Sequence, residues 1–90
     1  MNMEATTIPV KVYPARGGDV TALELTKPTL LRQLQVLVGG YIEIVRIDDK
    51  HTLVVNEEGL IHGLPLNVYA ESIGVAPFVG NGVIIESKFL

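Results

Sequence analysis

A single stretch of helical periodicity stands in a chain whose other patterned segments favour strands, which limits the fold to one main helix with a sheet. Its apolar side chains recur at the i, i+4 and i+7 positions, which lie on one face of a helix. Thr26 can cap this helix, and Pro28 is tolerated in its first turn, where a missing N–H loses no partner. Gly39 and Gly40 end it, because glycine readily adopts the left-handed cap conformation. We expect a Leu-rich helix over about residues 28–38, with a stripe formed by Leu30, Leu31, Leu34, Leu37 and Val38.

The other patterned segments predict strands: residues 7–14 alternate apolar and polar side chains, and residues 41–47 and 52–56 are rich in residue types that favour β structure. Turn residues join the segments over 7–14 and 20–25 into one hairpin and those over 41–47 and 52–56 into another. Pro9 cannot donate a hydrogen bond to a ladder, so it indicates an edge strand or a strand start. Asn67 can cap a short helix over about residues 68–73, ended by Gly74. We expect one α+β domain over residues 1–90, with a mostly antiparallel sheet of four to five strands and the Leu-rich helix packed on it. The expected strands are residues 7–14, 20–25, 41–47, 52–56 and 83–87.

The apolar content exceeds what one small core needs. Hydrophobic residues make up 48% of the 90-residue chain, and its mean hydropathy is +0.38. Both faces of the expected strand over residues 41–47 are apolar, with Ile42 and Ile44 on one and Val45 and Ile47 on the other. One helix cannot cover both faces, and large exposed apolar patches are unusual on monomers. We therefore expect a homodimer or a larger homo-oligomer.

Charge and cysteine content exclude several classes of partner and site. The net charge is −3, and the seven basic residues form no stripe that would suit duplex nucleic acid. The absence of cysteine excludes disulfides and thiolate metal sites and agrees with a cytoplasmic location. No apolar run approaches the roughly 20 residues of a membrane helix, and the first nine residues do not have the pattern of a signal peptide.

Residue types that carry catalysis are present without the arrangements that catalysis requires. His51 and His62 are not at metal-ligand spacing, so we expect no metal site. Ser72 and Ser87 have no surrounding nucleophile motif. Glu57 and Glu58 are adjacent in an extended segment, so their side chains point in opposite directions. We expect no catalytic residues and no cofactor.

Four parts of the sequence resemble a known family. They are LQVLVGGYIEIV at residues 34–45, LVVNEEG at 53–59, GLPLN at 63–67 and FVGNGVII at 78–85. Together they are similar to a widespread family of small domains of unknown function carried by phages, plasmids and their bacterial hosts. The likeness covers about residues 28–87 and departs at 68–72, where members often have a basic residue and Ala-Thr-Ala-Leu and this chain has VYAES. The resemblance implies an accessory protein that acts in the host cytoplasm by binding, often against host defence.

The resemblance and the lack of catalytic groups favour a non-enzymatic protein that sequesters a small phosphorylated ligand, such as a cyclic or ADP-ribose-type signalling nucleotide. Arg16, beside two glycines, or Arg46 would hold the phosphate. Tyr41 and Leu64 would sandwich a ring, and asparagines would bind a base edge or ribose. The expected site is Arg16, Tyr41, Arg46, Asn56, Glu57, His62, Gly63, Leu64 and Asn67.

Two alternatives remain open from the sequence. The first is a protein–protein module that inhibits or modulates a host protein, which predicts a flat apolar patch and no deep polar pocket. The second is a small hydrolase acting on a nucleotide. Recovery of an unchanged bound ligand would exclude the hydrolase, whereas product formation would support it.

Overall fold

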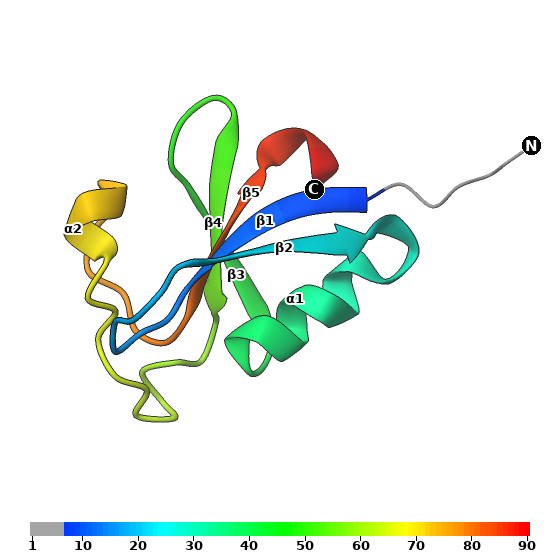
Figure 1. Ribbon diagram of the computed structural model, residues 1–90. Helices are drawn as coiled ribbons and strands as arrows, with labels where there is room; N and C mark the ends of the chain where they lie inside the picture. The colour runs from blue at the N-terminus through cyan, green and yellow to red at the C-terminus, as the bar shows by residue number, and fades with distance from the viewer. Residues whose placement is uncertain (1–6) are drawn as a thin grey trace, which may run out of the picture.

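The computed structural model describes residues 7–90, which form a five-stranded antiparallel sheet with one main helix packed on it (Figure 1). This confirms the expected α+β fold. The expectation about a signal peptide rests mainly on residues outside the described range. The strands are β1 (Thr7–Tyr13), β2 (Thr21–Thr26), β3 (Ile42–Arg46), β4 (His51–Asn56) and β5 (Gly82–Glu86). The helices are α1 (Leu30–Val38) and α2 (Ala70–Ile73), with 3-10 turns at Lys27–Thr29 and Ser87–Phe89.

The last strand joins the two hairpins into one sheet. The strand order is β2-β1-β5-β4-β3, so β5 lies between the β1–β2 hairpin and the β3–β4 hairpin. Its residues pair with both neighbours: Ile85 lies opposite Val10 of β1 and opposite Thr52 of β4. Of the two alternatives predicted from Pro9, an edge strand is wrong, because β1 is an interior strand, whereas a position near the strand start is what the structure has. Pairing with β5 begins only at Val10, so Pro9 lies near the start of β1, where β2 alone runs beside it.

Helix α1 covers one face of the sheet, here called the helix face. Leu34 and Val38 are buried, and Leu30 and Leu37 are half-buried beside them, as the predicted stripe requires. Leu31 was expected in the stripe, but it is 56% exposed and lies off the packed face. The helix ends at Gly39, whose φ of 83° is the left-handed conformation expected of that residue. The core that α1 covers is formed by alternate residues of the strands: Ile8, Val10, Val12, Leu25, Val54, Val83 and Ile85.

The start of α1 differs from the prediction. The chain first makes the 3-10 turn, and α1 begins at Leu30, two residues later than expected. Thr26 makes no side-chain capping bond to the helix. Instead, the Gln33 amide reaches back and bonds both backbone groups of Thr26, accepting from its N–H at 3.3 Å and donating to its carbonyl at 3.0 Å. Local sequence suggested a threonine cap, whereas the fold uses a glutamine from the next turn.

The chain's own segment between β4 and β5 covers part of the opposite face, here called the groove face. Phe78 lies against this face, and its placement depends on Gly82: a Cβ atom there would lie 2.9 Å from Phe78 Cζ and 2.9 Å from Leu53 Cδ1. Leu53 and Val55 of β4 are therefore buried although α1 lies on the other side of the sheet. From the sequence, a second copy of the chain was expected to cover this face. Over β4, the segment between β4 and β5 covers it instead.

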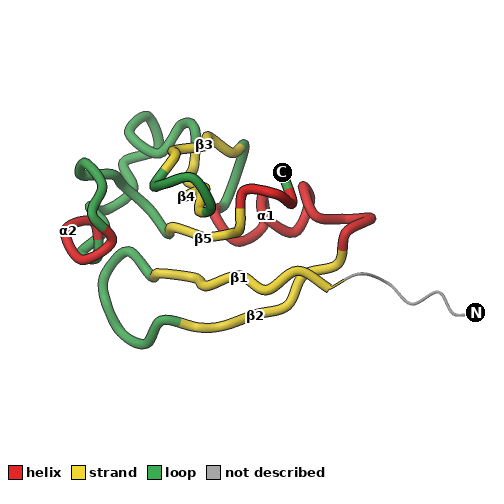
Figure 2. Tube along the Cα trace, turned by 90° about the horizontal axis from the view of Figure 1, so that it is seen from above, coloured by secondary structure: helices red, strands yellow, loops and turns green. Residues whose placement is uncertain are grey.

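Helix α2 and the loops around it gather at one end of the sheet, whereas α1 lies toward the other (Figure 2). The ring of Tyr69 packs edge-on against Tyr13 of β1, with centroids 5.4 Å apart, and its hydroxyl donates to the Gly18 carbonyl. The helix begins at Ala70 rather than at residue 68, and it ends at Gly74 as predicted. This end of the molecule carries the hollows described next.

Candidate functional site

A hollow of about 470 Å3 lies on the groove face and is called the apolar groove. Its floor is made by strand residues, Val45 of β3 with Leu53 and Val55 of β4. The loops before and after α2 form its walls. The wall and rim residues used below are Leu60, Ile61, Leu66, Phe78, Glu43, Glu57 and Glu58.

Three wall residues of the apolar groove are unusually exposed. Leu60, Ile61 and Leu66 are 83%, 80% and 66% accessible. They lie in the irregular segment after β4, where a left-handed Gly63, with φ of 68°, turns the chain. Large apolar side chains that stand exposed around a hollow with a buried apolar floor are typical of interaction sites.

The rim of the apolar groove is acidic. Glu43, Glu57 and Glu58 line it, and no lysine or arginine is among its lining residues. The only basic group in hydrogen-bonding contact with this rim in residues 7–90 is His62, whose Nε2 lies 3.3 Å from a Glu58 carboxylate oxygen. A rim of this charge disfavours phosphates and favours cationic groups.

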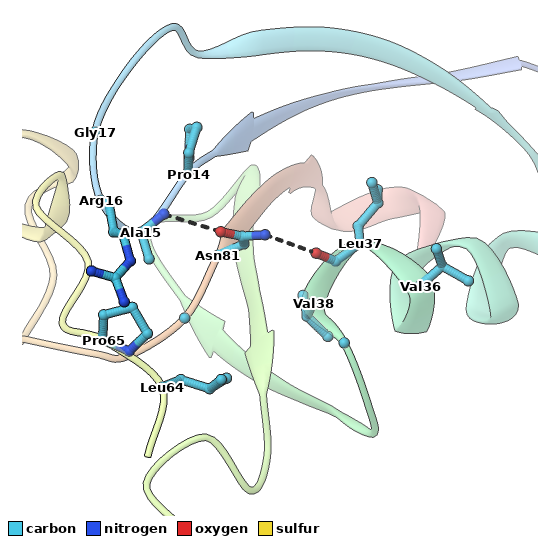
Figure 3. Close-up of a pocket in the computed structure, with 12 residues that line it drawn as sticks. Pro14, Ala15, Arg16, Gly17, Val36, Leu37, Val38, Leu64, Pro65 and Asn81 are labelled. Atoms are coloured by element: carbon cyan, nitrogen blue, oxygen red, sulfur yellow. Dashed lines mark hydrogen bonds between the residues drawn. The ribbon is translucent and has the colours of Figure 1, made fainter. Parts of the chain in front are cut away.

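A second hollow, of about 440 Å3, contains Arg16 and is called the Arg16 pocket. Figure 3 shows the guanidinium of Arg16 beside Pro65, with Leu64 below it. The Asn81 amide spans the pocket, accepting from the Ala15 N–H at 3.0 Å and donating to the Leu37 carbonyl at 3.3 Å. Arg16 is exposed and makes no ion pair with a carboxylate of residues 7–90.

The opposite wall of the Arg16 pocket limits its affinity for anions. It is formed by the last turn of α1 and by Gly39, which is the negative end of the helix dipole. Arg16 is the only lysine or arginine among the lining residues. One exposed cation facing a helix C-terminus is a weaker phosphate site than the converging donors that such ligands usually receive.

The structure places Asn56, an expected ligand-binding residue, in a buried structural role. Its amide nitrogen donates to the Val38 carbonyl at 3.0 Å, and its oxygen accepts from the Glu58 N–H at 2.7 Å. The side chain therefore joins the end of α1 to the end of β4. It lines the apolar groove with Glu57, but its hydrogen-bonding atoms already have partners inside the protein.

Asn67 has a similar structural role near the middle of the segment between β4 and β5. Its amide nitrogen donates to the carbonyls of Tyr13 and Gly80 at 3.0 and 2.9 Å. Its oxygen accepts from the Tyr69 N–H at 2.8 Å, one residue before α2 begins. The predicted N-cap is therefore corrected, because the amide bonds the turn preceding the helix and fastens that turn to β1 and to the residues before β5.

The remaining expected site residues are spread over the molecule. Arg46 is ion-paired with Asp49 at the β3–β4 turn and lines neither hollow. Tyr41 is 65% exposed, and its carbonyl accepts from the Glu57 N–H at 2.8 Å. The structure brings Arg16 and Leu64 together in one pocket and places Glu57 in the other. Sequence reasoning missed Leu60, Ile61, Leu66 and Phe78, whose only sequence signal was apolar residues within an irregular segment.

The described residues contain no group of three His, Cys, Asp or Glu side chains that could hold a metal ion. Among the hydrogen bonds of residues 7–90, the Ser87 hydroxyl pairs with Thr52 at 2.6 Å and the Ser72 hydroxyl donates to the Tyr69 carbonyl. None of the hydroxyl bonds in this part of the chain involves a histidine. None of the described helices is long and apolar enough to cross a membrane.

The Asp48 carboxylate makes several hydrogen bonds within the β3–β4 turn. Its carboxylate accepts from the Lys50 N–H at 2.8 Å and the His51 N–H at 2.7 Å and lies 3.0 Å from His51 Nδ1. The hydrogen bond from Lys50, followed by those from His51, lowers the pKa of Asp48 below its ordinary value of 3.8. The turn is therefore stabilised by the carboxylate form.

We expect the Asp48 carboxyl resonance to titrate below pH 3.8 when followed by NMR. Because the folded-state pKa is depressed, its contribution to stability is present at neutral pH and is lost as pH falls through that pKa. Asp48→Asn should flatten this acid limb, whereas Asp19→Asn serves as a turn-residue control. Titration of Asp48 at or above 3.8 would contradict the contacts that define the turn.

Comparison with known proteins identifies a family for this chain. A family model described as Domain of unknown function (DUF3846) matches residues 10–88, which confirms the resemblance to a family of small domains of unknown function. Neither the search of curated proteins nor that of solved structures found a match. Since the model covers nearly the whole chain, this protein belongs to the DUF3846 family.

Proposed function

We propose that this protein is a non-enzymatic binding protein that captures a segment of a partner protein in the apolar groove. The observation that supports this most is the exposure of Leu60, Ile61 and Leu66 around a floor of buried Leu53 and Val55 and half-buried Val45. Fully burying one such side chain contributes about 1.5–3 kcal/mol, so a few of them suffice for useful affinity.

The acidic rim supports one chemistry for the partner. Glu43, Glu57 and Glu58 surround the apolar surface, so a segment with apolar side chains flanked by lysine or arginine is complementary to it. The apolar contacts supply affinity, and the charges supply orientation and the rate of encounter. The resemblance to proteins of mobile elements makes a host protein the expected source of this segment.

Selection from a displayed random-peptide library tests this proposal. We expect enriched peptides to have an apolar centre and basic flanks, and the double variant Leu60→Ser/Ile61→Ser to bind them at least about tenfold more weakly. Leu31→Ser is the matched control, since Leu31 is 56% exposed on α1, away from the groove. Enrichment of acidic peptides, or equal binding by the double variant and the wild type, would contradict the proposal.

A second candidate function is sequestration of a small phosphorylated ligand in the Arg16 pocket. The exposed guanidinium in a hollow of about 440 Å3 supports it, and the adjacent helix C-terminus weighs against it. Calorimetry against cyclic and ADP-ribose-type nucleotides should give affinity below about 10 μM that Arg16→Gln abolishes. Weaker binding to the whole panel would remove this candidate, and recovery of a hydrolysed ligand would point to an enzyme instead.

A further inference from the structure

The outer edge of β3 carries backbone groups that no described segment pairs with. β3 is the last strand of the sheet and pairs only with β4. The Tyr41 carbonyl accepts from Glu57 N–H at 2.8 Å, and the Ile47 N–H donates to the His51 carbonyl at 3.0 Å. In an antiparallel ladder the two backbone groups of a residue point the same way and alternate along the strand. Even-numbered residues, Ile42, Ile44 and Arg46, therefore direct theirs away from β4.

The side chain at the centre of this edge is also exposed. Ile44 lies on the helix face opposite buried Val54, yet 53% of its surface is accessible, since α1 does not extend over it. Proteins usually protect a free edge with charges, proline or a bulge. The five residues of β3 include no proline, and the outward-facing charge, Arg46, lies at the end of the strand. The middle of the edge is an unprotected apolar position.

We propose that β3 pairs antiparallel with β3 of a second copy of this chain about a two-fold axis at Ile44. In this register, Ile44 lies opposite Ile44 of the second copy, and Ile42 lies opposite Arg46. All three outward-facing residues of each copy then exchange backbone hydrogen bonds. The two five-stranded sheets become one continuous sheet.

In the two neighbouring registers, fewer of the outward-facing backbone groups of β3 find a hydrogen-bond partner in the second copy. An axis at Glu43 places two glutamates directly opposite each other, which is destabilising, and leaves Arg46 beyond the paired strands. An axis at Val45 leaves Ile42 opposite Asp48, outside β3. With the axis at Ile44, Glu43 faces Val45 of the second copy, so no like charges oppose each other.

This pairing has a consequence for the groove face. A two-fold axis perpendicular to the sheet keeps both α1 helices on one face and both apolar grooves on the other. Glu43 and Val45 line the groove and also lie at the paired edge, so the two grooves become neighbours. The dimer would present them side by side to a partner, although the pairing itself does not depend on the proposed function.

Light scattering at micromolar concentrations tests the assembly. The wild type should have twice the chain mass of 9.8 kDa, and Ile44→Lys, which places two cations together at the axis, should have the mass of one chain. Val36→Lys is the matched control, since Val36 is 74% exposed on α1 and should leave the dimer intact. A wild-type monomer, or a dimer that survives Ile44→Lys, would overturn the proposal.

Cysteine crosslinking tests the register, because the chain contains no cysteine. Cα atoms of a hydrogen-bonded antiparallel pair are about 5.5 Å apart, within the range of a disulfide. Ile44→Cys should therefore form a covalent dimer on mild oxidation. Arg46→Cys on the same edge should not, because its two copies would be four residues apart along the strand, roughly 13 Å. Equal crosslinking of the two variants would overturn the Ile44 register.

Discussion

Asn67→Ala is expected to lower the free energy of unfolding by about 2–4 kcal/mol, a large effect for a side chain outside the apolar core. The amide is only 5% exposed and makes three hydrogen bonds, to Tyr13, Gly80 and Tyr69. Alanine removes all three and leaves the backbone groups without those partners in a place that water does not easily reach.

Chemical denaturation of the variant measures this loss, and Asn81→Ala is its control. Asn81 also makes two hydrogen bonds to backbone groups, to Ala15 and Leu37, but it is exposed, so water can replace them. We expect its substitution to change stability by less than about 1 kcal/mol. If Asn67 served mainly to bind a ligand, its replacement would instead leave stability unchanged.

Leu34→Ala is expected to destabilise the protein by about 3–5 kcal/mol. Leu34 is 1% exposed where α1 meets the sheet, among core residues from several strands. Truncation removes apolar contacts and leaves a cavity that packed strands cannot easily close. Since small domains are typically stable by only about 5–15 kcal/mol, this loss is a large part of the total.

Leu31→Ala separates packing from helix propensity. Leu31 lies on the same helix but is 56% exposed, and alanine favours helix at least as well as leucine does. We expect thermal unfolding of this variant to stay close to that of the wild type, with a change below about 1 kcal/mol. Similar losses for the two variants would mean that α1 does not pack on the sheet as described.

The two hollows could be predicted from the sequence only in part. Arg16 stood out because a cation beside two glycines suits a phosphate, and the structure does place it in a pocket. Asn56 and Asn67 stood out for their hydrogen-bonding capacity, but residue type does not reveal whether that capacity is used inside the protein. The apolar groove could not be predicted from the sequence, because its walls come from segments that have no periodic pattern and meet only in the folded chain.

Elements with local signals could be predicted without the fold. Period-two alternation indicated β1 and β-favouring residue types indicated β3 and β4, the leucine stripe and Gly39 specified α1, and Gly74 marked the end of α2. These patterns depend on neighbours a few residues apart, so they can be recognised without the fold. The position of β5 between the two hairpins follows from long-range strand pairing, and it makes β1 an interior strand despite Pro9 and leaves β3 at the edge. Strand order, the packing of Phe78 over Gly82 and the exposure of Ile44 arise from contacts between distant segments, which no local pattern encodes.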